Sequence, residues 1–175
     1  YPGVVTLFNE INRCQNSPDN KAHYVTARTT DWLYGVGEWL AQHGLPDGGI
    51  DGGVGPNPWL AQAEKVADIE KLLHQNPDKN YILFGDTNHR DPDVYREVIK
   101  RNPGRIVAAF IHRVKDIDPQ RLEGLSLFED YDTVAAQLHK CGVLDSEGAR
   151  KTMVAAQLEG LDISDARIQE LLSDS

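Results

Sequence analysis

Two aspartates frame a short polar loop in the middle of the sequence. Asp86 and Asp91 lie five positions apart and follow the apolar run YILF, residues 81–84, through Gly85. Carboxylates at the end of a buried strand suit a hard cation such as Mg²⁺, which takes oxygen ligands and keeps several waters. We therefore predict a magnesium site, with Asp86 as a direct ligand and Asp91 as a direct or water-mediated one. Gly85 would let the backbone turn and approach a ligand closely.

Both aspartates also have ordinary structural explanations. Asp91 precedes Pro92 and is well placed as the N-cap of the next helix. Asp86 suits a turn equally well. From these residues alone, metal binding is one of two interpretations of the loop.

Two further residues favour binding of a phosphate group. Thr26 ends the run HYVT, where its hydroxyl and nearby backbone amides could hold a phosphate oxygen. Lys65 lies among inward-facing apolar residues, and its ammonium could reach a phosphate as a point charge. The alternatives are an ordinary β-branched strand residue for Thr26 and a solvated lysine beside Glu64 for Lys65.

The elements that must position these residues alternate between strands and helices. We predict strands at 22–27, 81–84, 105–112 and 125–128, helices at 4–11, 31–43, 59–75, 92–101 and 131–142, and two terminal helices. This alternation is typical of an α/β fold, a three-layer Rossmann-like parallel sheet with helices on both faces. In such sheets the site lies at the carboxyl ends of the strands, where Thr26 and Asp86 both fall.

Two segments of the chain carry more detailed expectations. On the predicted helix 59–75, the apolar residues expected to face inward are Leu60, Ala63, Val66, Ile69 and Leu73. The segment 46–58 contains five glycines and three prolines without periodicity. We predict that it is an ordered loop or flap near the mouth of the site, where it would help to select substrate.

Composition narrows the classes of function. The 175 residues carry a formal net charge of −9, which argues against tight binding to nucleic acid or to an anionic membrane. A local basic pocket for phosphate stays open. No apolar run is long enough to cross a bilayer. Cys14 and Cys141 lack metal-ligand spacing and are expected to behave as small apolar residues, with a disulfide left open.

Three stretches of the sequence together resemble a known family. They are YVTARTTDWLYGVGEWLAQHGLPDG, KVADIEKLL and ILFGDTNHRDPDVYREVIKRNPGRIVAAFIH. They are similar to the haloacid dehalogenase-like phosphohydrolases, and most to the actin-patch-associated phosphatidate phosphatases, with lipins as more distant relatives. The resemblance covers about residues 1–142, which we predict to be the phosphatase domain, and leaves residues 143–175 as a C-terminal helical extension.

The resemblance implies roles for individual residues. Thr26 and Lys65 would be catalytic and stabilise the phosphoryl group, while Asp86 and Asp91 would hold Mg²⁺. The candidates for contact with the substrate, a small-molecule or lipid phosphate, are Arg28, Asn88 and His89. Phosphatidate phosphatases usually carry a second serine and a proline near the position of Thr26, whereas this chain has TARTTDW. A lipid substrate is therefore left open.

One element of the family has no clear counterpart here. The family's first strand ends in D-x-D-x-T, whose first aspartate attacks phosphorus to form an aspartyl-phosphate and whose second is the general acid and base. We expect this strand upstream of Tyr1 or on a second chain, pairing between the strands that end at Thr26 and Asp86. Asp130 and Asp132 have the motif's spacing, but a helix start explains them better.

The sequence therefore predicts most of a magnesium-dependent phosphatase domain, and the 175 residues alone are expected to be inactive. The alternative is a non-catalytic module of the same fold that binds a phosphorylated ligand or a protein, docking through apolar residues of its terminal helices such as Met153 and Ile168. We expect no nucleic-acid partner and no integral membrane segment.

Overall fold

The computed structural model describes residues 1–14, 22–29, 31, 33–53, 55 and 57–173. The chain forms two compact units, each built from separate stretches of sequence. The first unit comprises Tyr1–Ala22, Val36–Gly49 and Asp130–Ser175, and the second comprises His23–Gly35 and Ile50–Glu129. Every residue predicted for the site belongs to the second unit. The boundary predicted at residue 142 falls within the first unit, and the division based on family resemblance stays a prediction.

The second unit contains a parallel sheet of three strands. Its order is β3 (Tyr81–Asp86), β4 (Ile106–His112) and β5 (Ser126–Phe128), with a short 3-10 helix, η2 (Pro119–Leu122), before β5. Asp86 pairs in register with His112, so the carboxyl ends of β3 and β4 lie at the same edge of the sheet. The loop after β3 therefore starts where ligands bind in parallel α/β sheets.

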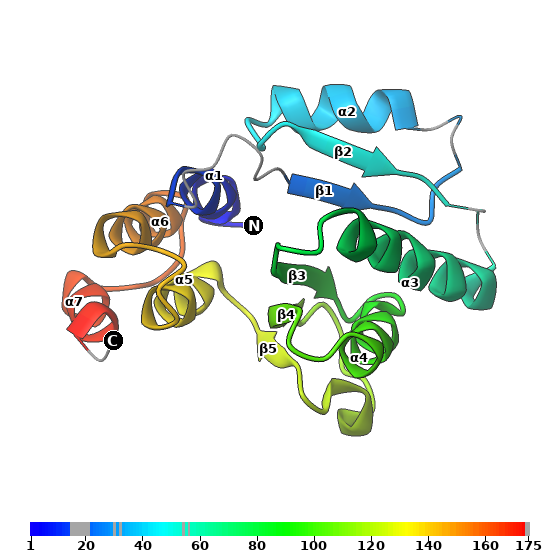
Figure 1. Cartoon of the computed structure of the whole chain (residues 1–175). Coiled ribbons are helices and arrows are strands. Elements are labelled where there is room, and N and C mark those ends of the chain that lie inside the picture. Colours follow the sequence, from blue (N-terminus) through cyan, green and yellow to red (C-terminus); the bar gives the residue numbers. More distant parts are fainter. Residues whose placement is uncertain (15–21, 30, 32, 54, 56, 174–175) are drawn as a thin grey trace. The chain divides into compact units, whose positions relative to one another are not determined.

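Two helices cover this sheet with a common apolar core. They are α3 (Pro58–Gln75) and α4 (Asp91–Arg101), visible beside β3 in Figure 1. The buried core residues are Val66, Ile69, Leu73, Leu83, Val94, Tyr95, Val98, Ala109 and Ile111. The inward positions predicted for Val66, Ile69 and Leu73 are confirmed. Those predicted for Leu60 and Ala63 are wrong, because both lie exposed in the first two turns of α3, N-terminal to its buried residues.

A second, two-stranded sheet corrects the prediction for the glycine-rich segment. β1 (Ala22–Val25) pairs with β2 (Gly48–Asp51), α2 (Leu33–Gln42) joins them, and both strands point the same way in Figure 1. β2 lies within the predicted loop 46–58. A Cβ on Gly48 would lie 2.0 Å from the Ala22 carbonyl oxygen, so only glycine fits here. The strand was missed because its pairing uses backbone groups and leaves no side-chain periodicity.

The predicted fold class is confirmed. The structure is α/β, with parallel strands in two sheets and helices around them, as in a three-layer Rossmann-like fold. Among the described residues, β1 pairs with β2 alone and β3 with β4 alone, so each has one unpaired edge. That a further strand pairs between them stays a prediction.

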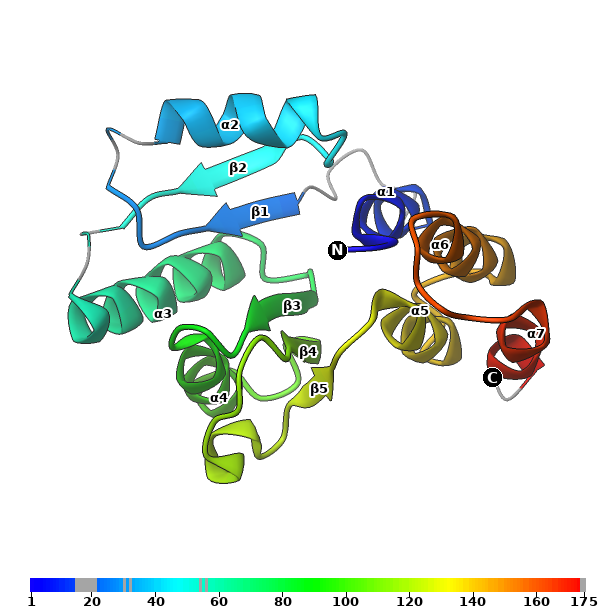
Figure 2. The same cartoon turned by 180° about the vertical axis from the view of Figure 1, so that it is seen from behind.

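The first unit is mostly helical. It packs together α1 (Val4–Cys14), α5 (Tyr131–Lys140), α6 (Ser146–Leu158) and α7 (Asp165–Ser173), as Figure 2 shows. Met153 and Ile168, suggested above as residues that dock a partner, are only 0% and 2% exposed and belong to this unit's own core. No helix in the described part of the chain is both long and apolar enough to span a membrane.

Candidate active site

The loop after β3 folds back over the end of its strand. Asp86 is the last residue of β3, and Asp91 is the first residue of α4. The backbone N–H of Asp86 donates to Asp91 Oδ2 at 3.2 Å. A Cβ on Gly85 would lie 2.6 Å from the Cβ of Asp91, so this folding requires glycine at position 85. The close approach that Gly85 permits is therefore to Asp91 itself.

The structural explanation of Asp91 as the N-cap of the next helix is wrong. The N-cap of α4 is Arg90, which makes no side-chain capping bond, and Asp91 occupies the first helical position. Asp91 is 8% exposed, and its carboxylate is held by Asp86 and by Lys65. The Asp91 carboxylate is therefore buried and accepts hydrogen bonds from two residues, which helix capping does not explain.

Lys65 reaches this loop from α3. Its Nζ lies 2.7 Å from Asp91 Oδ1, and the two side chains are 19% and 11% exposed. Lys65 thus contacts a carboxylate of the loop, and the alternative of a solvated lysine is wrong. The pair is a short, largely desolvated ion pair between residues 26 positions apart in sequence.

Thr87 ties the loop to the segment that follows β4. It is 1% exposed, and its Oγ1 accepts hydrogen bonds from the backbone N–H groups of Val114 and Lys115, each at 2.9 Å. The same hydroxyl donates to the carbonyl of Lys115 at 2.8 Å. Sequence reasoning missed Thr87, for which the only signal was its position next to Asp86.

Tyr95 of α4 hydrogen-bonds to the end of β3. Its hydroxyl donates to the carbonyl of Phe84 at 2.6 Å. Burial raises the pKa of Tyr95 well above its ordinary value, and the carboxylates of Asp91 and Asp86 add to the effect. The phenol therefore stays protonated and keeps donating to the backbone beside Gly85.

Asn88 and His89, predicted to bind substrate, are exposed at the tip of the loop. The N–H of Asn88 donates to Asp86 Oδ1 at 2.7 Å, a turn contact that leaves the second carboxylate oxygen of Asp86 without a contact among the described residues. Lys115 Nζ donates to the Asn88 carbonyl, and Arg121 donates to the His89 carbonyl. Lys115 and Arg121 thus hold the backbone at the tip of the loop. The side chains of Asn88 and His89 lie at the surface.

Thr26 and Arg28 form a separate turn at the end of β1. Thr26 Oγ1 accepts a hydrogen bond from the backbone N–H of Arg28 at 3.2 Å, and the Arg28 side chain is exposed. Within the described part of the chain, no contact joins Thr26 to Asp86 or Asp91. That Thr26 and Asp86 belong to one site, and the roles of Thr26 and Arg28, stay predictions.

Asp130 and Asp132 lie at the start of a helix, as predicted in preference to a nucleophile motif. β5 ends at Phe128, Asp130 is the N-cap of α5, and Asp132 lies in its first turn. Burial raises the pKa of Asp132, with a further increase from Asp130. Neither carboxylate directly follows a strand, as the D-x-D-x-T motif expected from the resemblance would.

The comparison with known families decides the classification. Residues 1–113 match the family described as phosphatidate phosphatase APP1, catalytic domain. The chain belongs to this family. No curated protein and no solved structure gives a significant match. The APP1 match spans Thr26, Lys65 and the loop from Asp86 to Asp91, and ends directly after β4. Membership makes the chain a phosphatidate phosphatase-like phosphohydrolase.

The Lys65–Asp91 pair of this APP1-family chain should be energetically coupled. Lys65→Met leaves the buried Asp91 carboxylate without its cation, so we expect it to lower the free energy of unfolding by about 2 kcal/mol. Asp91→Asn should lower it as well, and the double variant should lose less than the sum, with a coupling of about 1–2 kcal/mol. Urea unfolding measures the three changes.

Lys71→Met is the matched control for this cycle, since Lys71 is an exposed lysine on the same helix. It should change stability by no more than about 0.5 kcal/mol. Strict additivity of Lys65→Met and Asp91→Asn would show that the contact is not an energetically significant ion pair.

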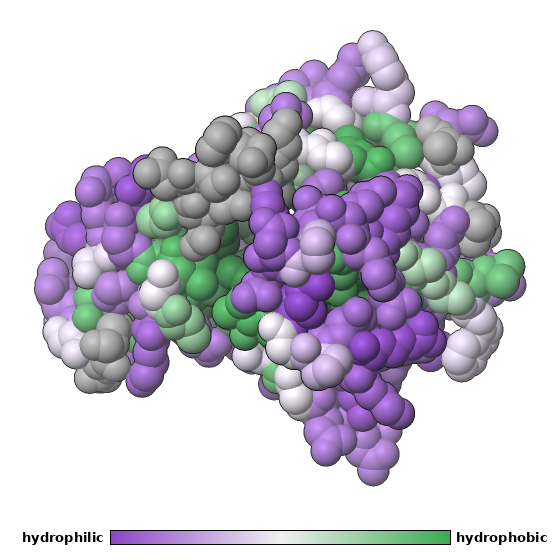
Figure 3. Space-filling view, in the orientation of Figure 1, coloured by the Kyte–Doolittle hydropathy of each residue, from purple (hydrophilic) through white to green (hydrophobic). Residues whose placement is uncertain are grey.

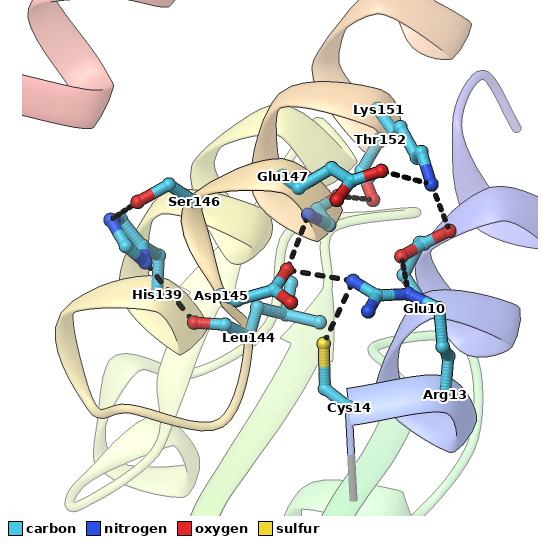
Figure 4. Close-up of polar contacts among 11 residues, drawn as sticks. Glu10, Arg13, Cys14, His139, Leu144, Asp145, Ser146, Glu147, Lys151 and Thr152 are labelled. Carbon is cyan, nitrogen blue, oxygen red and sulfur yellow. Dashed lines mark hydrogen bonds and ion pairs between the residues drawn. The ribbon is translucent and has the colours of Figure 1, made fainter. Parts of the chain in front are cut away.

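A second cluster of potential metal-ligating groups lies in the first unit. Glu10 and Cys14 fall within the APP1 match, and Asp145 falls outside it. Glu10, Cys14 and Asp145 each place one ligand atom within 4.8 Å of the others. Arg13 lies among them, because its guanidinium donates to Glu10, to Cys14 Sγ at 3.2 Å and to Asp145 at 2.7 Å (Figure 4). The guanidinium already supplies the positive charge, so the cluster is an ion-pair network that ties α1 to the start of α6.

This network predicts a dependence of stability on pH. The hydrogen bond from Arg13, followed by that from the Gly148 N–H, lowers the pKa of Asp145 to about 2. A lowered pKa means that the stabilisation is present above the unfolded value near 4 and is lost as the pH falls towards 2. Arg13→Gln should therefore raise the pH midpoint of acid unfolding, measured by circular dichroism.

Arg96→Gln serves as the control, because Arg96 is a partly exposed arginine paired with Glu123 in the second unit. It should leave the acid midpoint nearly unchanged. An equal acid midpoint in the wild type and in Arg13→Gln would contradict a stabilising role for the Asp145 contact.

Proposed function

We propose that this chain forms most of the catalytic domain of a Mg²⁺-dependent phosphatase that hydrolyses a phosphomonoester of the phosphatidate type through an aspartyl-phosphate. The fold would be of the haloacid dehalogenase-like kind. The observation that carries the proposal is the cluster of Asp86, Asp91 and Lys65 at the carboxyl end of β3, within the segment that matches the APP1 catalytic domain.

The donor set at the loop fits Mg²⁺. Carboxylate oxygens are its preferred protein ligands, and Mg²⁺ usually takes only one or two carboxylates besides water and substrate phosphate. Asp86 keeps one carboxylate oxygen without a contact among the described residues, which suits a direct ligand. Both oxygens of Asp91 already accept hydrogen bonds, from Lys65 and from the Asp86 N–H, which favours contact through water. Bound there, Mg²⁺ would neutralise charge on the phosphoryl oxygens.

The remaining residues would position and stabilise the phosphoryl group. Lys65, fixed by Asp91, would direct its ammonium to a phosphate oxygen, and the Thr26 hydroxyl would donate to another. Preorganised donors of this kind contribute strongly because they need no rearrangement as charge develops. Arg28, Asn88 and His89 are exposed at the ends of β1 and β3 and would contact the rest of the substrate.

The nucleophile would come from outside the 175 residues, on an upstream segment or another chain. Support comes from the placement of Asp130 and Asp132 at the start of α5, and from the unpaired edges of β1 and β3 among the described residues. A strand there would end in the family's D-x-D-x-T motif. Its first aspartate would attack phosphorus, and its second would transfer the protons.

The test is release of inorganic phosphate by a longer polypeptide that contains the residues encoded before Tyr1. Dioctanoyl phosphatidate and an aryl phosphate are the substrates, with Mg²⁺ or with EDTA. We expect Mg²⁺-dependent hydrolysis of both, and faster hydrolysis of phosphatidate. Tight binding of phosphatidate without any hydrolysis would instead support a non-catalytic phosphate-binding module.

A further inference from the structure

The N-terminal turn of α3 exposes two neighbouring apolar side chains. Trp59 is 68% exposed and Leu60 is 57% exposed, both in the first turn after the Asn57 cap and Pro58. Hydrophobic surface protrudes at this end of α3 in Figure 3, on the right of the view. Single exposed apolar residues are common on proteins, so the significance of this pair depends on what lies beside it.

Trp59 is attached to the loop of the proposed active site. The guanidinium carbon of Arg90 lies 3.8 Å from the centre of the Trp59 ring, and Arg90 Nε donates to Gln62 Oε1 at 2.5 Å. Arg90 directly precedes Asp91, which is bound by Lys65. Trp59, Gln62 and Lys65 follow one another at three-residue spacing along one side of α3. The exposed turn and the loop are therefore held together by consecutive contacts.

The surroundings of the loop differ in charge from the chain as a whole. The chain has a formal net charge of −9, whereas the four cations in or bound to the loop (Arg90, Lys65, Lys115 and Arg121) face three carboxylates (Asp86, Asp91 and Asp93), which leaves a local charge of +1. Lys65 pairs with Asp91, and Arg90 and Arg121 pair with Asp93, so this position repels an anionic headgroup less than the rest of the chain does. Tryptophan favours the headgroup level of a bilayer, leucine the acyl boundary, and arginine binds phosphate.

We propose that Trp59 and Leu60 dock the protein on the surface of a phosphatidate-containing bilayer and so bring the loop to the lipid headgroup. The inference rests on the proposed function, whose substrate it places in a membrane. A protein partner fits less well, because stable protein interfaces bury about 1,200–2,000 Å² and two side chains supply only a small part of that. Shallow insertion of two side chains beside a loop whose surroundings carry no net negative charge suffices for weak, reversible membrane contact.

The decisive variant is Leu60→Ser, which removes an inserting side chain but leaves the Trp59–Arg90 contact in place. In the longer polypeptide, we expect it to lower hydrolysis of phosphatidate in phosphatidylcholine vesicles about tenfold. Hydrolysis of monomeric dioctanoyl phosphatidate should be unchanged. Leu158→Ser is the matched control, because Leu158 is 82% exposed on α6 in the first unit, and it should change neither rate.

Quenching of tryptophan fluorescence by brominated lipid gives a readout independent of catalysis. Residues 1–175 should be quenched by phosphatidate-containing vesicles, and Trp59→Phe should remove most of the effect. Equal loss of both hydrolysis rates in Leu60→Ser, or no quenching that depends on Trp59, would overturn the docking proposal. Absence of hydrolysis with either substrate in the unchanged protein would reject the proposed function. In that case, quenching that depends on Trp59 would still show whether the protein docks on the bilayer.

Discussion

Asp86→Asn is expected to lower Mg²⁺-dependent hydrolysis by about a thousandfold, which corresponds to a loss of about 4 kcal/mol of transition-state stabilisation. The substitution removes the anionic oxygen that would contact the metal ion directly. It preserves the shape of the side chain, and the Asn Oδ1 can still accept the hydrogen bond from the Asn88 N–H. The loop should therefore fold normally while its affinity for Mg²⁺ falls.

Two measurements separate metal binding from folding in this experiment. Calorimetric titration with Mg²⁺ should show weakened binding in Asp86→Asn, and urea unfolding without metal should change by less than about 1 kcal/mol. Asp116→Asn is the control, since its carboxylate is 96% exposed beyond the end of β4. Unchanged metal affinity and unchanged turnover in Asp86→Asn would remove the metal site from this loop.

The second large effect concerns the nucleophile. We expect residues 1–175 alone to show no hydrolysis of an aryl phosphate even with Mg²⁺, and the longer polypeptide to turn it over. Without an attacking aspartate, the cations and hydroxyls of the loop can bind phosphate but cannot form the aspartyl-phosphate. The added strand should also pair with the edges of β1 and β3 that are unpaired among the described residues, which would protect those backbone amides from hydrogen exchange.

Asp130 provides the internal control for this experiment. Asp130→Asn in the longer polypeptide should keep its activity, because Asp130 is the N-cap of α5 rather than a residue at a strand end. Robust turnover by residues 1–175 that disappears in Asp130→Asn would be the opposite result. It would make the segment FEDYDTV the nucleophile loop and refute the requirement for a further strand.

The strand end that carries the candidate site was predictable from local sequence. The run YILFGD predicts a strand that ends in a carboxylate, because apolar residues followed by glycine and polar residues specify a buried strand and a turn. The alternation of strands and helices gave the fold class for the same reason. The phosphatase family was visible in the order and spacing of these segments and is confirmed by the APP1 match.

Only the tertiary structure decided which distant groups meet. Asp91 could cap its helix by local rules, yet its carboxylate turns to Lys65 on α3 and to the Asp86 N–H, because Gly85 leaves room for it. Arg90, the N-cap of α4, lies over Trp59 of α3, and β2 forms by backbone pairing that leaves no pattern in the side chains. Periodicity describes how a segment arranges its own residues, whereas these contacts join residues brought together only when the elements pack.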